Sequence, residues 1–158
     1  KWDVELTPTT STIADWKDEI EFLVIEGLPA LSEVVFFHKP SKTLLLTDLA
    51  FNHKKGHSSS WILRSYLALT KGYRECCVTT PFKVRTSSLL HVCPLTPFSN
   101  NLLAHGEDSA ALTRSLNKLM EWDFDSVILA HGDIIQRNGK EIFGRGSYQF
   151  FTGATHTH

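Results

Sequence analysis

The chain has 158 residues, of which 42% are hydrophobic and 11% aromatic, and its formal net charge is -1 with histidine neutral. This length and composition predict one domain with a single buried core. The near-neutral charge excludes a global field that would favour nucleic acid or an anionic membrane. The short basic run His53-Lys54-Lys55 is better explained as a solvated turn than as a phosphate-binding patch. No run approaches the ~20 apolar residues that cross a bilayer, so no transmembrane segment is predicted.

The cysteines and the start of the chain bear on where the protein works. Cys76 and Cys77 are adjacent and cannot easily bridge each other, and with Cys93 the total is odd, which argues against a disulfide framework. Without C-x-x-C spacing, no structural zinc site is predicted. We therefore expect an intracellular, reducing compartment, with a plastid or a mitochondrion left open. The start Lys1-Trp2-Asp3-Val4 has no initiator Met and no signal-peptide pattern, which indicates a processed, truncated or incompletely represented chain.

The first part of the chain predicts an extended lead-in followed by three strands. Residues 1–12 mix Pro and Thr with few apolar anchors, and a short helix is expected to begin near Ser11 or Thr12. Three runs rich in β-branched, aromatic and aliphatic residues then predict strands. A short turn containing Pro40 joins the second and third, so these two are expected to form an antiparallel hairpin. The third is almost continuously apolar, which is typical of a strand buried on both faces. The predicted strands are 20–25, 33–38 and 43–48.

The middle of the chain predicts two helices separated by loops. Ser60 is expected to cap the first helix, whose apolar stripe ends at Gly72. Prolines punctuate residues 73–106, where we expect loops with one or two short helices. Asp108 is expected to cap a stronger helix, because its apolar residues recur with helical spacing. These residues are Leu112, Leu116, Leu119 and Met120.

The last part of the chain predicts one more strand and a final helix. Residues 126–130 form a short apolar run that predicts a buried strand, and His131-Gly132-Asp133 follows it directly. Asn138-Gly139 is a turn pair, after which a helix is expected to run from Lys140 toward Phe151. Residues 152–158 are expected to be a disordered tail.

Two segments of the chain carry motifs that belong together. The first is residues 33–52, EVVFFHKPSKTLLLTDLAFN, and the second is residues 122–135, WDFDSVILAHGDII, with Asn138-Gly139 after it. In this order they resemble an uncharacterised family allied to the metallo-β-lactamases, found in bacteria and in photosynthetic eukaryotes. In that fold a hairpin strand ends in Asp and a later strand ends in His followed by Gly. The resemblance covers residues 13–151 and implies the C-terminal portion only.

The resemblance implies a fold of the α/β (α+β) class. It would be a partial metallo-β-lactamase-like αβ/βα sandwich, with a mixed sheet, flanking helices and a metal site at the C-terminal ends of strands. The first half of that fold normally carries an H-x-H-x-D-H cluster, and no such cluster occurs in this sequence. On the usual scale of domain sizes, on the order of a hundred residues of the fold would lie outside this chain.

The resemblance also implies which residues would hold a metal. Asp48 matches the carboxylate that bridges two cations, and His131 matches a late His ligand. Where the fold usually has Gly-His before the hairpin, this chain has Gly27-Leu28, and leucine cannot ligate. Glu33 and His38 are weak substitutes, and His38 is expected to face solvent beside the turn. A zinc, iron or manganese centre that makes hydroxide from a shared water needs more ligands than this pair.

The residues also permit a role for this pair without metal. Asp48 would cap the loop after its strand, and His131 would hydrogen-bond to it across one rim of the sheet, so that both polar groups are satisfied. Asp133 is expected to be a loop residue and not a third ligand. His53 and His57 would share a helix face only in a helical segment, which the intervening Lys-Lys-Gly disfavours. No catalytic residue is assigned, and no cofactor is expected unless the metal site is retained.

Two functions follow from these predictions. The first is a non-catalytic or degenerate metallo-β-lactamase-like domain, acting as a structural or assembly subunit or as half of a split domain. The second is a metal-dependent hydrolase whose site is completed by a missing N-terminal half. Strands 20–25 and 43–48 would expose apolar faces unless something covers them, so a protein partner or that missing half is expected on the sheet. No nucleic-acid partner is expected.

Overall fold

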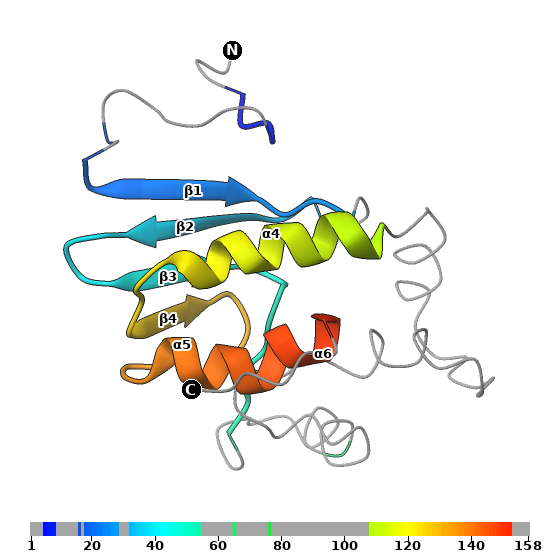
Figure 1. Ribbon diagram of the computed structural model, residues 1–158. Helices are drawn as coiled ribbons and strands as arrows, with labels where there is room; N and C mark the ends of the chain where they lie inside the picture. The colour runs from blue at the N-terminus through cyan, green and yellow to red at the C-terminus, as the bar shows by residue number, and fades with distance from the viewer. Residues whose placement is uncertain are drawn as a thin grey trace.

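The computed structural model describes residues 5–8, 16, 18–28, 32–54, 65, 76 and 108–152. Within these ranges the chain forms one four-stranded sheet, with helices lying across it (Figure 1). The strands lie in the order β1-β2-β3-β4. They are β1 (Ile20–Val24), β2 (Val34–His38), β3 (Thr43–Leu46) and β4 (Ser126–Leu129). The helices are α4 (Ser109–Glu121), α5 (Gly139–Phe143), the π-helix η1 (Gly144–Tyr148) and α6 (Gln149–Thr152).

The sheet is mixed, as the α/β class predicts. β1 pairs antiparallel with β2, and β2 pairs antiparallel with β3, which confirms the predicted hairpin. Lys42 closes its turn by donating its N–H to the Lys39 carbonyl at 3.1 Å. β3 and β4 are parallel, so their C-terminal ends lie at the same edge of the sheet. This parallel pair, separated by some eighty residues of chain, fixes where the site described below can form.

The strands are one or two residues shorter than the sequence predicts. The clearest case is β3, which ends at Leu46 although the apolar run suggested residue 48. The backbone N–H groups of Thr47 and Asp48 donate to the carboxylate of Glu33 instead of continuing the ladder. A side-chain acceptor therefore ends this strand, which periodicity alone could not reveal.

The core lies between one face of the sheet and the helices. Alternate residues of the strands point to this face, as the two-residue period of a strand requires. β2, β3 and β4 contribute Val35, Phe37, Leu44, Leu46, Val127 and Leu129, and the helices contribute Leu112, Leu116, Leu119 and Phe143, all buried in one cluster. The predicted apolar stripe of the helix that begins after Asp108 is therefore its sheet-facing side.

The opposite face of the sheet carries an apolar row across all four strands. The registers align Phe22 with Phe36, Phe36 with Leu45, and Leu45 with Ile128. Trp16 stacks on Phe36 with ring centroids 6.1 Å apart, so the chain covers part of the row itself. At the other end Ile128 is 39% exposed, and Leu45 is only partly buried. The far face of β3 is therefore less covered than its continuous apolar character predicts.

The helix boundaries confirm one predicted cap and correct one predicted helix. Asp108 accepts hydrogen bonds from the N–H groups of Ala110 and Ala111, both at 3.0 Å, and so caps α4 as expected. The final helix, predicted as one element, is divided by the π-helix η1, in which the buried Ser147 hydroxyl donates to the Cys76 carbonyl at 2.9 Å. Thr152, assigned to the tail from sequence, is the last residue of α6.

Several predictions fall on parts of the chain that lie outside the described residues. These are the short helix after residue 11, the helix over residues 60–72, the loops of residues 73–106 and the tail beyond Thr152. Residues 5–8, in the predicted lead-in, form no helix or strand. Cys76 is fully buried. Among the helices that the structure describes, none has the length and apolar character needed to span a bilayer.

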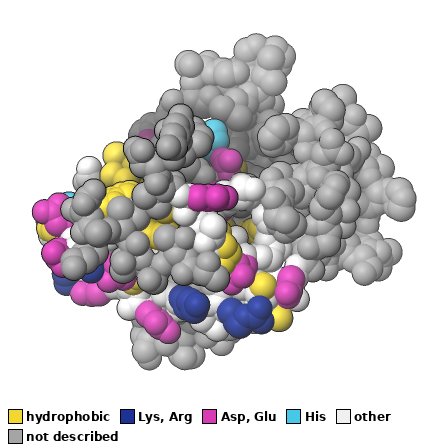
Figure 2. Space-filling model, turned by 90° about the horizontal axis from the view of Figure 1, so that it is seen from above, with side chains coloured by type: hydrophobic (Ala, Val, Ile, Leu, Met, Phe, Trp, Pro, Cys, Tyr) yellow, Lys and Arg dark blue, Asp and Glu magenta, His cyan; other side chains and the backbone are white. Residues whose placement is uncertain are grey.

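Charges of both signs are interspersed on the surface that Figure 2 shows. Lys42 Nζ lies 2.6 Å from Asp123 Oδ2 and ties the hairpin turn to the segment before β4. The hydrogen bond from Lys42, and then its positive charge, lower the pKa of the Asp123 carboxyl below its ordinary value. The same hydrogen bond raises the pKa of Lys42. This exposed pair sits at the hairpin end of the sheet, away from the edge where β3 and β4 end.

Candidate functional site

Asp48 and His131 meet at the edge of the sheet where β3 and β4 end. Each follows its strand by two residues, and the parallel pairing of Leu46 with Leu129 brings them side by side. His131 Nε2 lies 3.0 Å from Asp48 Oδ1, and the two side chains are 53% and 46% exposed. The sequence predicted that this pair would be neighbours at one rim of a shared sheet, and the structure confirms this proximity. At this exposure, both side chains are accessible to solvent.

The backbone beneath this pair is locked by a close approach of two segments. Asn52 N–H donates to the His131 carbonyl at 3.1 Å, and Asp133 N–H donates to the Asn52 carbonyl at 2.7 Å. Gly132 lies between them with a φ of 113°, a conformation that favours glycine. A Cβ atom at this position would lie 2.1 Å from the Asn52 carbonyl oxygen. The glycine after His131 is therefore required for the two segments to touch.

Glu33 holds the loop that carries Asp48. Its side chain is buried, with only 2% of the residue exposed. Its Oε1 accepts from Thr47 N–H at 2.7 Å, and its Oε2 accepts from the Thr47 hydroxyl and from Asp48 N–H at 3.2 Å. Both carboxylate oxygens are thus directed at the loop after β3. These contacts support a positioning role for Glu33, although the sequence suggested it as a weak metal ligand.

His38 lies at the other end of the sheet. It ends β2 beside the hairpin turn, and its Nδ1 lies 2.6 Å from the Ser41 hydroxyl. Glu33 and His38 are five residues apart along an extended strand, which is roughly 16 Å. The structure therefore brings Glu33 to Asp48 but leaves His38 remote from it.

Phe51 and His53 join the site, although the sequence analysis did not place them there. The Phe51 ring stacks on the His131 imidazole with centroids 5.3 Å apart and an interplanar angle of 10°. The same ring lies 6.3 Å from that of His53. Burial lowers the pKa of His53, the charge of His131 lowers it further, and Asp133 partly opposes this. The signal in the sequence was the alternation of Phe51 and His53 in an extended segment just after Asp48.

A catalytic zinc is usually held by three protein ligands. Asp48 and His131 supply two candidate donors, which lie 3.0 Å from each other, within hydrogen-bonding distance. Within the described ranges, no three His, Cys, Asp or Glu side chains converge so as to hold a metal ion. The residues present there do not fit a closed metal centre.

The Asp48–His131 pair has a defined hydrogen-bonding chemistry. A carboxylate only accepts hydrogen bonds, so the His131 Nε2 that faces it carries the proton. In the neutral imidazole the other nitrogen, Nδ1, is then the basic one. Stacking on Phe51 restricts the ring further. The pair can therefore fix an imidazole orientation and accept a proton, but the contacts shown contain no nucleophile beside it.

Comparisons with known proteins found no match to this chain. No protein-family model matches the chain, and neither a curated protein nor a solved structure matches it. The resemblance to the metallo-β-lactamases rests on the two sequence motifs alone. What the structure adds is a mixed four-stranded sheet with helices, and the meeting of the two motif residues Asp48 and His131 at one edge.

Proposed function

We propose that the chain is a degenerate metallo-β-lactamase-like domain that acts as a non-catalytic structural or assembly subunit in an intracellular, reducing compartment. The observation that carries this proposal is the direct contact of Asp48 with His131 at 3.0 Å. In a hydrolytic centre these two groups would share a cation. Here His131 and Asp48 form a hydrogen bond with each other, and this bond joins the ends of two parallel strands.

The surroundings of the pair support a structural role. Asp48 is held through its backbone by the buried carboxylate of Glu33, and His131 is held by the ring of Phe51. Gly132 and Asn52 then join the two loops through backbone hydrogen bonds. Packing and hydrogen bonds within the protein thus hold both positions, which supports a structural role for the pair.

Elemental analysis tests the absence of a catalytic metal. We expect purified protein to carry zinc, iron and manganese well below one equivalent, and chelator to leave its melting temperature unchanged. Asp48→Ala should cost no more than about 1 kcal/mol, because the pair is half exposed. Asp123→Ala, which removes an exposed ion pair at the other end of the sheet, is the matched control. Stoichiometric metal that Asp48→Ala abolishes and Asp123→Ala retains would contradict the proposal.

That contradictory outcome would favour the alternative, a metal-dependent hydrolase. One observation favours this alternative. Asp48 and His131 are about half exposed, so a further ligand could approach both. Such a site needs at least one ligand in addition to this pair. Asp48 and His131 would help to hold such a metal, and its chemistry would be the activation of a water molecule as the nucleophile.

The assembly role rests on the sheet face that carries Phe22, Phe36, Leu45 and Ile128. The helices pack on the other face, Trp16 stacks on Phe36 and Phe22 is buried, so the exposed part of this row lies at its β4 end. Ile128 at the β4 end is one of two large hydrophobic residues that are exposed among the described residues. We propose that an apolar surface of a protein partner covers this end of the row, because burying a row of large apolar side chains supplies the main driving force for association.

Association of the isolated chain tests this surface. In sedimentation velocity at rising concentration, we expect the chain to form larger species and Ile128→Asn to shift it toward monomer. Ile134→Asn is the matched control, because Ile134 is 53% exposed but lies in the loop after β4 and not on this face. A chain that stays monomeric at high concentration would contradict the proposal, as would equal effects of the two substitutions.

A further inference from the structure

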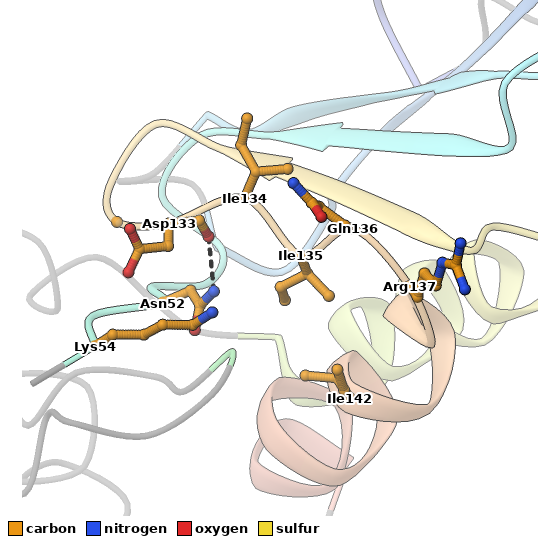
Figure 3. Close-up of a pocket in the computed structure, with 9 residues that line it drawn as sticks. Asn52, Lys54, Asp133, Ile134, Ile135, Gln136, Arg137 and Ile142 are labelled. Carbon is orange, nitrogen blue, oxygen red and sulfur yellow. Dashed lines mark hydrogen bonds between the residues drawn. The ribbon is translucent and has the colours of Figure 1, made fainter.

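A hollow of about 640 Å³ lies beside the Asp48–His131 pair, under the loop that follows β4 (Figure 3). This volume falls in the range of pockets that bind small molecules, roughly 300–1,000 Å³. Its walls come from the segment after β3, the loop after β4 and α5. The lining residues are Asn52, Lys54, Gly132, Asp133, Ile134, Ile135, Gln136, Arg137 and Ile142. Neither Asp48 nor His131 is among them.

One wall holds a buried acceptor that has no partner. Asn52 is 1% exposed, and its Nδ2 donates to the Asp133 backbone carbonyl at 2.6 Å. A carbonyl only accepts, so this bond fixes which end of the amide is nitrogen. The other end, Oδ1, is buried and finds no hydrogen-bond donor in the described part of the chain. Buried amide oxygens are almost always paired, so this oxygen indicates that a donor arrives from a ligand.

The hollow carries a cation at each end, Lys54 beside Asn52 and Arg137 at the opposite end. Figure 3 shows Arg137 at the end away from Asn52 and Asp133, with Gln136 and Ile135 between them. Arg137 is exposed, and no ion pair within the described residues engages its guanidinium. A free guanidinium presents a fork of N–H donors that matches a carboxylate or a phosphate, whereas the ammonium of Lys54 is a point charge. The anionic group of a ligand is therefore placed at Arg137.

The part between the two polar ends is apolar. Ile135 is buried in the floor, and Ile142 of α5 is partly buried beside it. Ile134 is 53% exposed and adds a third apolar side chain to this part of the lining. A short aliphatic body placed against these three residues would join the cationic end to the acceptor end.

We propose that this hollow binds a small amphiphilic organic anion: a carboxylate at Arg137, a short aliphatic chain along the isoleucines, and a hydroxyl or amide N–H that donates to Asn52 Oδ1. A ligand needs both the carboxylate and the donor, because Arg137 and Asn52 Oδ1 lie at opposite ends of the same cavity. This binding activity goes beyond the proposed assembly role and does not depend on it.

A titration with 8-hydroxyoctanoate, whose hydroxyl and carboxylate lie at opposite ends of one aliphatic chain, tests the site when it is followed by NMR of the protein amides. We expect shifts at the lining residues, and weaker binding of two matched compounds by several-fold or more. Octanoate lacks the hydroxyl that reaches Asn52, and the methyl ester of 8-hydroxyoctanoate lacks the charge that reaches Arg137. Comparing ligands avoids altering the buried Asn52, whose substitution could unfold the loop.

Substitutions of exposed residues complete the test. Arg137→Ala should weaken binding of 8-hydroxyoctanoate about tenfold, the scale of one lost charge-assisted hydrogen bond. Ile134→Asn should weaken it as well. Arg145→Ala and Ile128→Asn, which change exposed residues outside the lining, should leave it unchanged. No binding at 10-millimolar-scale ligand (roughly the limit for a specific site), equal binding of all three compounds, or insensitivity to Arg137→Ala would overturn the proposal.

Discussion

Replacing Glu33 with alanine should lower the free energy of unfolding by about 3–5 kcal/mol. The carboxylate is buried and accepts from Thr47 N–H, the Thr47 hydroxyl and Asp48 N–H. Its removal leaves these donors without their acceptor and opens a cavity at the end of β3. Urea unfolding monitored by tryptophan fluorescence measures the loss. The ring resonances of His131 should shift in the same variant, because the loop that presents Asp48 to it is released.

Two further substitutions separate the charge of Glu33 from its shape. Glu33→Gln preserves the size but turns one acceptor into a donor that faces the donors of Thr47 or Asp48. We expect an intermediate loss of about 1–3 kcal/mol. Glu21→Gln removes a carboxylate whose side chain is 45% exposed and which pairs with Lys39 at 2.9 Å, and should change stability by less than about 1 kcal/mol. Equal losses at Glu33 and Glu21 would show that burial and hydrogen bonding at Glu33 contribute nothing.

Gly132→Ala should cost about 3 kcal/mol of folding free energy and separate the two loops of the site. Part of the loss is the strain of an alanine at a φ of 113°, about 1–3 kcal/mol. The rest is steric, because the new Cβ would lie 2.1 Å from the carbonyl oxygen and 2.5 Å from the carbonyl carbon of Asn52. These are backbone atoms, so only a shift of the whole segment could relieve the overlap. Thermal unfolding measures the cost.

The same variant has a local signature. Parting Asn52 from Gly132 should expose the Asn52 and Asp133 amides, which donate across this contact, to faster hydrogen exchange. Gln136→Ala is the matched control, since Gln136 is an exposed residue of the same loop and should change stability by no more than about 0.5 kcal/mol. An alanine variant at position 132 that is as stable and as protected as the control would mean that the close approach is not needed.

Much of the local structure could be predicted from the sequence because it depends on neighbouring residues. The hairpin follows from two β-type runs around the Pro40 turn, and the structure pairs them as predicted. Asp108 was identified as a cap because an N-cap acts on amides two and three residues away. The division of the last helix by η1 could not be predicted, since it accompanies the long-range bond from Ser147 to Cys76.

The candidate site was predictable only in part. The motifs identified Asp48 and His131, and the resemblance suggested that they meet. The sequence did not predict that the Glu33 side chain is buried. The N–H groups of Thr47 and Asp48, which donate to its carboxylate, lie across the hairpin. Phe51 and His53 were missed because their role depends on a ring from another segment. The hollow near Arg137 has no motif, since its walls come from three separate elements.

From the residues alone, periodicity and turn chemistry determined which segments form strands and helices, and which apolar side chains belong to the core. Those signals act over a few residues, and one strand or helix face is enough to express them. Only the tertiary structure decided that β3 and β4 lie parallel and adjacent, although some eighty residues separate them. That pairing joins Asp48 to His131, presses Gly132 against Asn52 and shapes the hollow beside them. Contacts of this kind depend on the packing of the whole sheet, which no local pattern encodes.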